Sequence, residues 1–295
     1  MTEGSPDYGD EYLTVADGLR LHYRDFAGAA DKPPLLCLHG LTRNARSFDN
    51  LAARIAPRRR VIALDFRGRG LSDYDPQSER YTPLIYSGDV LHLLDELAIG
   101  EAVFLGTSLG GLVTMAIAAM APERIKAGIL NDVGPDVAPG GVDRILTYVG
   151  KDRRFANWDE AAAAVEAAQG SQYEKFGRDD WVAMAKRNCR EENGEIRFDY
   201  DMAIAEPFKS LGATPAVDLW PFFEALAQKP LLVIRGEKSD LLTPETAAKM
   251  QRVAPQLKLA TVPGVGHAPE LDEPVAAAAI EDFLGSLSFR GKASR

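Results

Sequence analysis

The chain has 295 residues, of which 46% are hydrophobic and 26% are charged. This length suits one large domain or a domain that carries an insertion, and the composition is ordinary for a globular protein. The formal net charge is −9 and the sequence pI is about 5.1. Because phosphate groups bind to positive surfaces, this balance argues against nucleic acid and anionic membranes as partners.

The two cysteines predict neither a disulfide nor a metal site. Cys37 lies in an apolar run, and Cys189 is far away in the sequence without the spacing of metal ligands. Residues 1–10 are acidic and polar, with neither the basic start nor the apolar centre of a signal peptide. No apolar stretch is long enough to span a bilayer. We therefore expect a cytoplasmic location and no membrane partner.

The order of the expected elements predicts an α/β fold. Residues 12–15 and 19–23 flank Asp17-Gly18, a dipeptide typical of hairpin turns. Runs that are apolar on both faces follow, as is typical of parallel strands covered by helices. These strands are expected at Leu35–Leu38, Val61–Leu64, Ala102–Leu105, Ile125–Leu130, Leu231–Ile234 and Leu257–Val262. Helices are expected at 87–97, 112–120 and 274–284. The alternation favours an open, mostly parallel, doubly wound sheet.

One interval breaks this alternation and predicts an insertion. Residues 134–223 contain helical patterns at 159–169 and 179–190, but no convincing buried strand. We therefore expect a helical cap at 134–223, inserted between a first core part at 1–133 and a second core part at 224–295. The interval is rich in aromatic residues, most of which we expect to form its own small core.

The motif at residues 106–111 (GTSLGG) carries the central functional prediction. It follows one apolar strand and leads directly into an apolar helix, which is the context that a nucleophile elbow requires. Such a turn holds Ser108 in a strained conformation with its hydroxyl lifted out of the sheet. Gly106 and Gly110 remove side chains where strand and helix would collide. The helix N-terminus stabilises developing negative charge, and the Leu109 N–H is the first expected oxyanion donor.

A serine nucleophile needs a base, and the chain offers only four histidines. His22 lies in the N-terminal hairpin, His92 lies within a helix, and His39 ends a buried strand. His267 follows the last expected strand in a loop flanked by glycine, at the edge of the sheet where such folds place chemistry. We therefore expect His267 to act as general base and then as general acid.

The base needs a carboxylate that orients it, and two aspartates are candidates. Asp240 lies in the loop after the strand at 231–234, and we choose it as the acid of the triad. Asp132 directly follows the preceding strand at 125–130 and is the alternative. A second oxyanion donor is expected in the loop after the first parallel strand. There Gly40 lets the backbone turn, so that the Leu41 N–H can face the nucleophile.

With these residues, the sequence resembles the α/β-hydrolase superfamily over nearly its whole length. The matching landmarks are His39-Gly40, residues 65–72 (DFRGRGLS), the elbow at Ser108, residues 236–240 and Gly266-His267. Within the superfamily, the chain is similar to esterases, enol-lactonases and carbon–carbon bond hydrolases that carry a cap. The resemblance implies an eight-stranded sheet, a helical cap over the site and a structural turn at 65–72. The chain order Ser…Asp…His is the one found in this superfamily.

The departures from the family's patterns narrow the expected chemistry. Ser108 stands where dehalogenases and epoxide hydrolases of this superfamily carry aspartate, which argues against both. Leu41 and Thr42 after Gly40 fit neither the triple-glycine loop of one lipase group nor the glycine–proline loop of carbon–carbon hydrolases. We expect hydrolysis of a small-molecule carboxylic ester or lactone through an acyl-serine intermediate. No metal or cofactor is implied, and the sequence does not indicate an oligomeric state.

The alternatives share the triad or the fold. A carbon–carbon bond hydrolase and a cofactor-free perhydrolase or haloperoxidase would use the same three residues. A non-catalytic receptor would keep the fold and close the cap on a ligand, but the presence of all three triad residue types argues against it.

Overall fold

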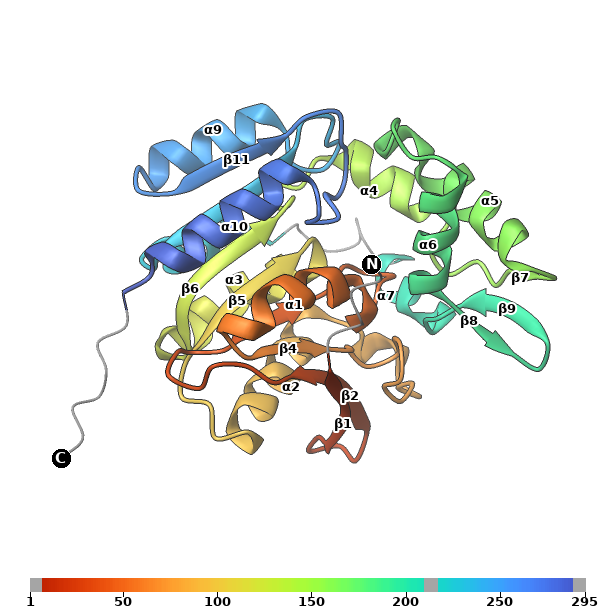
Figure 1. Ribbon diagram of the computed structural model, residues 1–295, viewed down its shortest axis with the longest axis horizontal. Coiled ribbons are helices and arrows are strands. Elements are labelled where there is room, and N and C mark those ends of the chain that lie inside the picture. The colour runs from red at the N-terminus through yellow and green to blue at the C-terminus, as the bar shows by residue number, and fades with distance from the viewer. Residues whose placement is uncertain (1–6, 210–216, 289–295) are drawn as a thin grey trace.

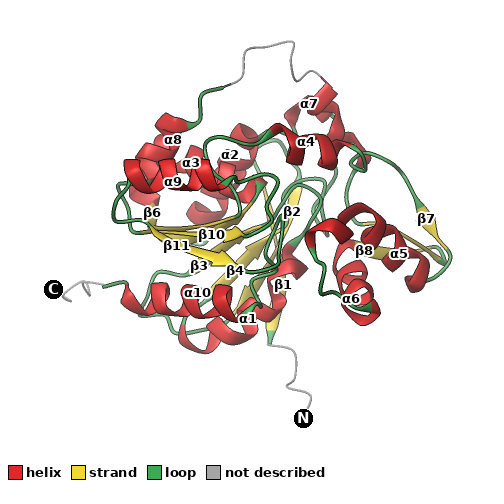
Figure 2. Ribbon diagram, turned by 90° about the horizontal axis from the view of Figure 1, so that it is seen from above, coloured by secondary structure: helices red, strands yellow, loops and turns green. Residues whose placement is uncertain are grey.

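The computed structural model describes residues 7–209 and 217–288 of the chain. Parts of the three expected domains, residues 1–6, 210–216 and 289–295, lie outside the described residues. The described chain contains an eight-stranded sheet with helices on both faces, and a second, smaller group of elements beside it (Figures 1 and 2). None of the helices in the described ranges is long and apolar enough to cross a membrane.

The sheet starts with the expected hairpin. Strands β1 (Tyr8–Thr14) and β2 (Arg20–Phe26) pair antiparallel, and the turn between them places Gly18 at a positive φ of 87°. Only glycine adopts this backbone conformation readily, which explains the Asp17-Gly18 dipeptide. Strand β2 then pairs antiparallel with β4 (Val61–Leu64), so the hairpin forms one edge of the sheet.

The remaining strands are parallel, and the predicted mostly parallel sheet is confirmed. They are β3 (Leu35–Leu38), β4, β5 (Ala102–Thr107), β6 (Ile125–Asn131), β10 (Leu231–Gly236) and β11 (Lys258–Val262). The strand order is β1-β2-β4-β3-β5-β6-β10-β11. Every residue of β3, β4 and β10 is buried, as expected for strands with helices on both sides.

Two helical layers bury the two faces of the sheet, as Figure 2 shows. One layer contains α2 (Pro83–Glu96), α3 (Leu109–Met120), α8 (Trp220–Leu226) and α9 (Pro244–Val253). The other contains α1 (Asp49–Ile55) and α10 (Pro274–Ser286). The local sequence determines where several of these helices begin. In α2 and α9, a proline stands in the first turn and the side chain of Thr82 or Thr243 accepts a backbone N–H.

Between β6 and α8 the chain leaves the sheet and forms an inserted segment, whose described residues are 132–209 and 217–219. Its helices are α4 (Pro139–Leu146), α5 (Trp158–Gln169), α6 (Arg178–Asn188) and α7 (Glu206–Lys209). They pack beside the carboxyl ends of the sheet strands (Figures 1 and 2). Buried Phe155, Tyr173 and Trp181 belong to a core formed within this segment, in agreement with the expectation for its aromatic residues.

The inserted segment is not wholly helical, as the sequence analysis expected it to be, although its strands are not buried ones. It contains a small antiparallel sheet in the order β7-β9-β8, formed by β7 (Arg154–Phe155), β8 (Cys189–Glu192) and β9 (Glu195–Phe198). These strands are short and half-exposed, so they lack the continuous apolar runs that marked the strands of the large sheet. Short 3₁₀ turns complete the described chain at Ala45–Phe48, Ala56–Arg58, Ser78–Arg80, Pro122–Arg124, Gly170–Gln172 and Met202–Ala205.

Candidate active site

Ser108 lies at the sharp turn between β5 and α3, as the motif predicted. Its backbone has φ 52° and ψ −114°, a strained conformation for a residue with a side chain. The glycines on either side make the turn possible. A Cβ on Gly106 would lie 2.4 Å from the backbone of Gly110, and a Cβ on Gly110 would lie 2.0 Å from the carbonyl oxygen of Leu38. Strand and helix therefore approach each other closely enough to hold the serine rigidly.

Replacement of Gly110 by alanine is expected to lower the free energy of unfolding by at least about 3 kcal/mol, because backbone atoms must move to admit the methyl group. Gly88→Ala is the matched control, since Gly88 also lies within a helix but has open space around it. That change should alter stability by no more than about 1 kcal/mol, in the stabilising direction. Urea unfolding of both variants measures the difference. Equal stability of the two variants would contradict the close packing at the elbow.

His267 faces the serine from the loop that follows β11. Its Nε2 lies 3.0 Å from Ser108 Oγ. The inserted segment supports this loop from outside the sheet. Gln172 Oε1 accepts the His267 backbone N–H at 2.8 Å, and the Gln172 backbone oxygen accepts the Gly266 N–H at 2.7 Å. The imidazole is largely buried, with 9% of its side chain exposed.

The carboxylate beside His267 is that of Asp132, and the expectation that Asp240 occupies this place is corrected. Asp132 Oδ2 lies 2.8 Å from His267 Nδ1, and the Asp132 side chain is fully buried. An ionised carboxylate can only accept hydrogen bonds, so Nδ1 of a neutral His267 carries the proton. Nε2 is then free to accept the hydroxyl proton of Ser108. The structure thus places Asp132, the alternative in the sequence analysis, in line with Ser108 and His267.

Asp240 pairs instead with an arginine of the inserted segment. Arg144 on α4 donates from Nε to Asp240 Oδ2 at 2.6 Å and from a terminal nitrogen to Oδ1 at 3.0 Å. Burial acts to raise the pKa of Asp240, but the bond to Arg144 outweighs it and holds the pKa below its usual value. Asp240 therefore stays ionised and ties α4 to the loop after β10.

Two groups that the sequence did not reveal hold Asp132 in place. The Ser239 hydroxyl donates to Asp132 Oδ2 at 2.6 Å, and the Gly236 N–H donates to Oδ1 at 2.8 Å. Gly236 ends β10, and Ser239 lies in the loop that follows, the same loop that carries Asp240. Ser239 also accepts the N–H groups of Leu241 and Leu242, so the loop folds around its hydroxyl. No sequence signal distinguishes Ser239 from an ordinary turn serine.

The loop after β3 presents the second expected oxyanion donor. The Gly40 carbonyl is held by His39 Nδ1 at 2.7 Å and by the Arg43 N–H at 3.1 Å. In a trans peptide the N–H points away from the carbonyl, so these bonds orient the Leu41 N–H. Arg69 fixes the next peptide by donating to the Leu41 carbonyl at 3.0 Å. Within the described residues, neither the Leu41 nor the Leu109 N–H has a hydrogen-bond partner.

His39 is a structural residue in this arrangement. Burial lowers its pKa to about 4, so the ring is neutral near pH 7. In that form Nδ1 donates to Gly40 and Nε2 accepts the Phe66 N–H at 3.1 Å. His92 contacts the carbonyl of Thr14 at 3.1 Å, far from the serine in the fold.

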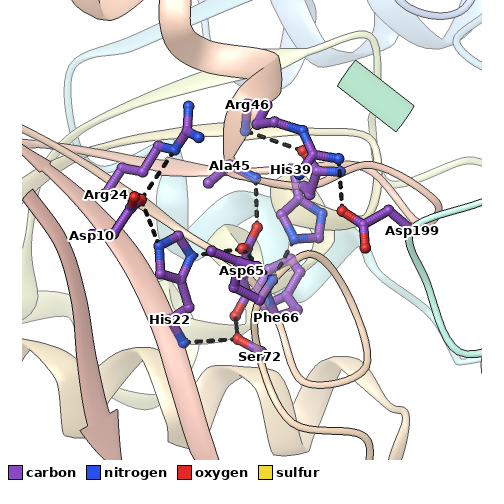
Figure 3. Close-up of polar contacts among 12 residues, drawn as sticks. Asp10, His22, Arg24, His39, Ala45, Arg46, Asp65, Phe66, Ser72 and Asp199 are labelled. Carbon is purple, nitrogen blue, oxygen red and sulfur yellow. Dashed lines mark hydrogen bonds and ion pairs between the residues drawn. The ribbon is translucent and has the colours of Figure 1, made fainter. Parts of the chain in front are cut away.

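A polar network around Asp65 fixes residues 65–72, as Figure 3 shows. Asp65 accepts the Ala45 N–H at 2.6 Å and contacts His22 Nδ1 at 2.7 Å, while the other nitrogen of His22 contacts Asp10 at 2.9 Å. The Ser72 hydroxyl donates to the Asp65 carbonyl at 2.6 Å. These contacts agree with the structural turn that the resemblance implied for this stretch.

A cavity lies in front of Ser108, with about 650 Å³ of empty space including its open mouth. The loop after β3, the His267 loop and the inserted segment all contribute walls. The lining includes Arg43, Ser47, Tyr148, Gln169 and Glu270. Among the described aromatic residues of the inserted segment, Tyr148 is the one that lines this cavity. In the described ranges, no three His, Cys, Asp or Glu side chains are grouped as they would be around a metal ion.

The chain matches a family model described as alpha/beta hydrolase family over residues 35–280. It is similar to the 3-hydroxybutyrate-oligomer hydrolase of Cupriavidus necator, with 34% identity over 95% of this chain and 98% of that protein. It is also similar to the 2-(acetamidomethylene)succinate hydrolase of Mesorhizobium japonicum, with 30% identity over 85% of this chain and 88% of that protein.

Solved structures give the same picture of the fold. The crystal structure of an alpha/beta hydrolase from Novosphingobium aromaticivorans matches with a TM-score of 0.91 and 50% identity, over 96% of this chain and 99% of that chain. The structure of E-2-(acetamidomethylene)succinate hydrolase matches with a TM-score of 0.81 and 26% identity, over 95% of this chain and 100% of that chain.

Proposed function

Because this chain belongs to the alpha/beta hydrolase family, we propose that it is a serine hydrolase that cleaves a carboxylic ester or lactone. The fold and the general hydrolase activity follow from that membership. The observation that supports the finer assignment is the line of contacts from Ser108 through His267 to buried Asp132. A hydroxyl next to a basic nitrogen that is backed by a carboxylate is a nucleophile poised for acyl transfer.

The reaction runs in two halves. Ser108 Oγ attacks the carbonyl carbon while its proton passes to His267 Nε2, and Asp132 stabilises the imidazolium that forms. The tetrahedral intermediate collapses, the bond to the alcohol oxygen breaks, and His267 returns the proton to that oxygen. A water molecule then attacks the acyl-serine with His267 as base, which releases the acid and restores the hydroxyl of Ser108. With a lactone, alcohol and acid leave as one hydroxy acid.

The oxyanion would be held by the N–H groups of Leu41 and Leu109. Leu109 begins α3, whose aligned peptide dipoles place partial positive charge at this end of the helix. Leu41 belongs to the peptide that His39 orients through the Gly40 carbonyl. Donors fixed before the substrate arrives stabilise charge without reorganising during the reaction. Removal of one such donor typically lowers kcat by about 10² to 10³.

The inserted segment would act as a cap over the cavity. It supplies Tyr148 and Gln169 to the cavity wall and supports the backbone of His267 through Gln172. The segment thereby shapes the space available to the substrate. The ester class of the proposed substrate is favoured by the relative from Cupriavidus necator, which is named as a hydrolase of 3-hydroxybutyrate oligomers.

Labelling with a fluorophosphonate probe tests the proposed chemistry directly. The probe should attach to Ser108 in the wild-type chain, and peptide mass spectrometry should locate it there. Hydrolysis of a panel of esters should give acid and alcohol in equal amounts, and hydrolysis of a lactone should give one hydroxy acid. An unlabelled Ser108 together with no ester turnover would contradict the proposal. Cleavage only of diketones, or turnover only with peroxide, would replace it with carbon–carbon hydrolysis or perhydrolysis.

A further inference from the structure

Arg43 carries a charge into the cavity that the triad chemistry does not use. It lies two residues after Leu41 in the loop that follows β3, and it lines the same cavity as Ser108. Only 14% of its side chain is exposed. Two of its closest partners are neutral amide oxygens of the inserted segment, Gln169 Oε1 at 3.0 Å and Asn188 Oδ1 at 3.1 Å. These partners orient the guanidinium but do not cancel its charge.

The carboxylate near Arg43 is shared with a second arginine. Glu270 Oε1 lies 3.2 Å from Arg43, whereas Glu270 Oε2 lies 2.6 Å from Arg187. Burial acts to raise the pKa of Glu270, but the two arginines outweigh it and hold the pKa below its usual value. Glu270 is therefore ionised, and its closer partner is Arg187. The three side chains together carry one excess positive charge.

Two further carboxylates near the cavity have partners of their own. Asp240 is paired with Arg144 in two hydrogen bonds. Asp132 is engaged by His267, Ser239 and Gly236.

The tyrosines beside Arg43 carry no charge near neutral pH. Tyr148 lines the cavity, and burial raises its pKa. Tyr173 donates its hydroxyl to the carbonyl of Ala268 at 2.6 Å, and burial raises its pKa as well.

A hydrogen-bonding group without a partner lies on the same cavity wall. The Ser47 hydroxyl is buried and has no hydrogen-bond partner within the described residues. A buried positive charge without full compensation is costly, as is a buried hydroxyl without a partner. An anionic acceptor placed in the cavity would relieve both costs.

We propose that the substrate of this enzyme is an ester that also carries a carboxylate, and that Arg43 binds this carboxylate. The inference rests on the proposed function, since it concerns the same cavity and adds the chemical class of the substrate. Asn188 accepts from one terminal nitrogen of the guanidinium, and Gln169, Met184 and Glu270 surround the other. The carboxylate would therefore accept from the remaining N–H donors of Arg43. Arg43 is thus a specificity residue that selects anionic over neutral esters, while Ser108 cleaves both.

The experiment compares two substrates that differ only at one end. One is the linear dimer of 3-hydroxybutyrate with a free carboxylate, and the other is the same dimer with that carboxyl group converted to a primary amide. The quantity measured is the ratio of kcat/KM for the acid to kcat/KM for the amide. The wild-type enzyme should favour the acid by at least about tenfold, as expected for a hydrogen bond between charged groups.

Two substitutions should move this ratio in opposite directions. Arg43→Gln removes the charge and should lower the ratio by about 10- to 100-fold, with Arg43→Lys between it and the wild type. Glu270→Gln removes the competing carboxylate and should raise the ratio. Arg178→Gln is the matched control, because it makes the same change at an exposed arginine of α6 that pairs with Asp159 and does not line the cavity. That change should leave the ratio unchanged.

The outcomes separate this inference from the proposed function. If Arg43 only ties the loop to the inserted segment, Arg43→Gln will lower stability and Glu270→Gln will leave the ratio unchanged, which overturns the inference. A wild-type ratio near one overturns it as well, although hydrolysis of both dimers still supports an esterase. Absence of turnover with both dimers, together with no fluorophosphonate labelling, contradicts the proposed function itself. If Arg43→Gln does not fold, Glu270→Gln and Arg43→Lys decide the question.

Discussion

Replacement of Ser108 by alanine is expected to lower kcat for the best ester by about 10⁴- to 10⁶-fold, since triad members act as a unit. The hydroxyl is the only group that the proposed mechanism offers as a nucleophile, and His267 Nε2 would have no proton to accept. Any remaining turnover would come from oxyanion stabilisation and binding alone. Steady-state kinetics with a chromogenic ester measures the effect, because even slow hydrolysis is visible in such an assay.

A control variant and a stability measurement show whether the loss of kcat comes from the missing hydroxyl or from misfolding. Ser286→Ala removes an exposed hydroxyl at the end of α10, which lies outside the cavity of Ser108. It should keep wild-type kinetics. The unfolding midpoint of Ser108→Ala should equal or exceed that of the wild type, because alanine keeps the Cβ and removes only a polar atom. If the Ser108→Ala enzyme retained more than a few per cent of the wild-type kcat, Ser108 would not be the nucleophile.

Asp132→Asn is expected to lower kcat by about 10³- to 10⁴-fold, the size of effect seen when a triad aspartate becomes an amide. The amide nitrogen of asparagine would donate to His267 Nδ1, where the carboxylate now accepts. The histidine would then carry its proton on Nε2 and could not accept the proton of Ser108. The loss should therefore fall on kcat, and the ester should still bind with a similar KM.

Asp240→Asn is the matched variant, because it makes the same chemical change in the other candidate. It weakens the pair with Arg144, so it should loosen the contact between α4 and the loop after β10. We expect a loss in kcat of less than about tenfold, since a partly exposed ion pair contributes little. If Asp240→Asn instead abolishes activity while Asp132→Asn barely matters, the contacts seen here do not describe the working enzyme.

The large sheet could be predicted because its strands carry a strong and local signal. Runs such as Leu35–Leu38 and Val61–Leu64 are apolar on both faces, and each is followed by residues that break a strand. The elbow was equally accessible, since the spacing of Gly106, Ser108 and Gly110 reports how closely α3 must approach β5 and β3. Both inferences depend on residues that are neighbours in the chain.

The choice between the two aspartates depended on contacts that are distant in the chain. Asp132 directly follows β6 and Asp240 follows β10, and these two strands lie side by side in the sheet. Both carboxylates therefore reach the same edge of the sheet, and the local sequence does not indicate which of them contacts His267. The decision comes from Ser239, which holds Asp132, and from Arg144, which is 96 residues away from Asp240.

The small sheet of the inserted segment was missed although a local signal existed. Asn193 and Gly194 connect β8 to β9, with φ angles of 55° and 81°. An Asn-Gly pair with both residues at positive φ is the strongest short-range indication of a hairpin. The flanking strands are rich in charged residues, such as Glu191 and Arg197, so their alternation was too weak to mark them. Turn chemistry was the better guide here than hydrophobic pattern.

The support that Gln172 gives to the histidine loop ties substrate access to readiness for chemistry. Its side chain and its backbone hold two consecutive amides, those of Gly266 and His267. A movement of the inserted segment that carried residue 172 outward would release the loop that sets the position and orientation of the imidazole. Opening at this point would move the imidazole away from Ser108, and closing would bring it back into place. A substrate or product that passes without displacing the imidazole must therefore use a side of the entrance away from residue 172.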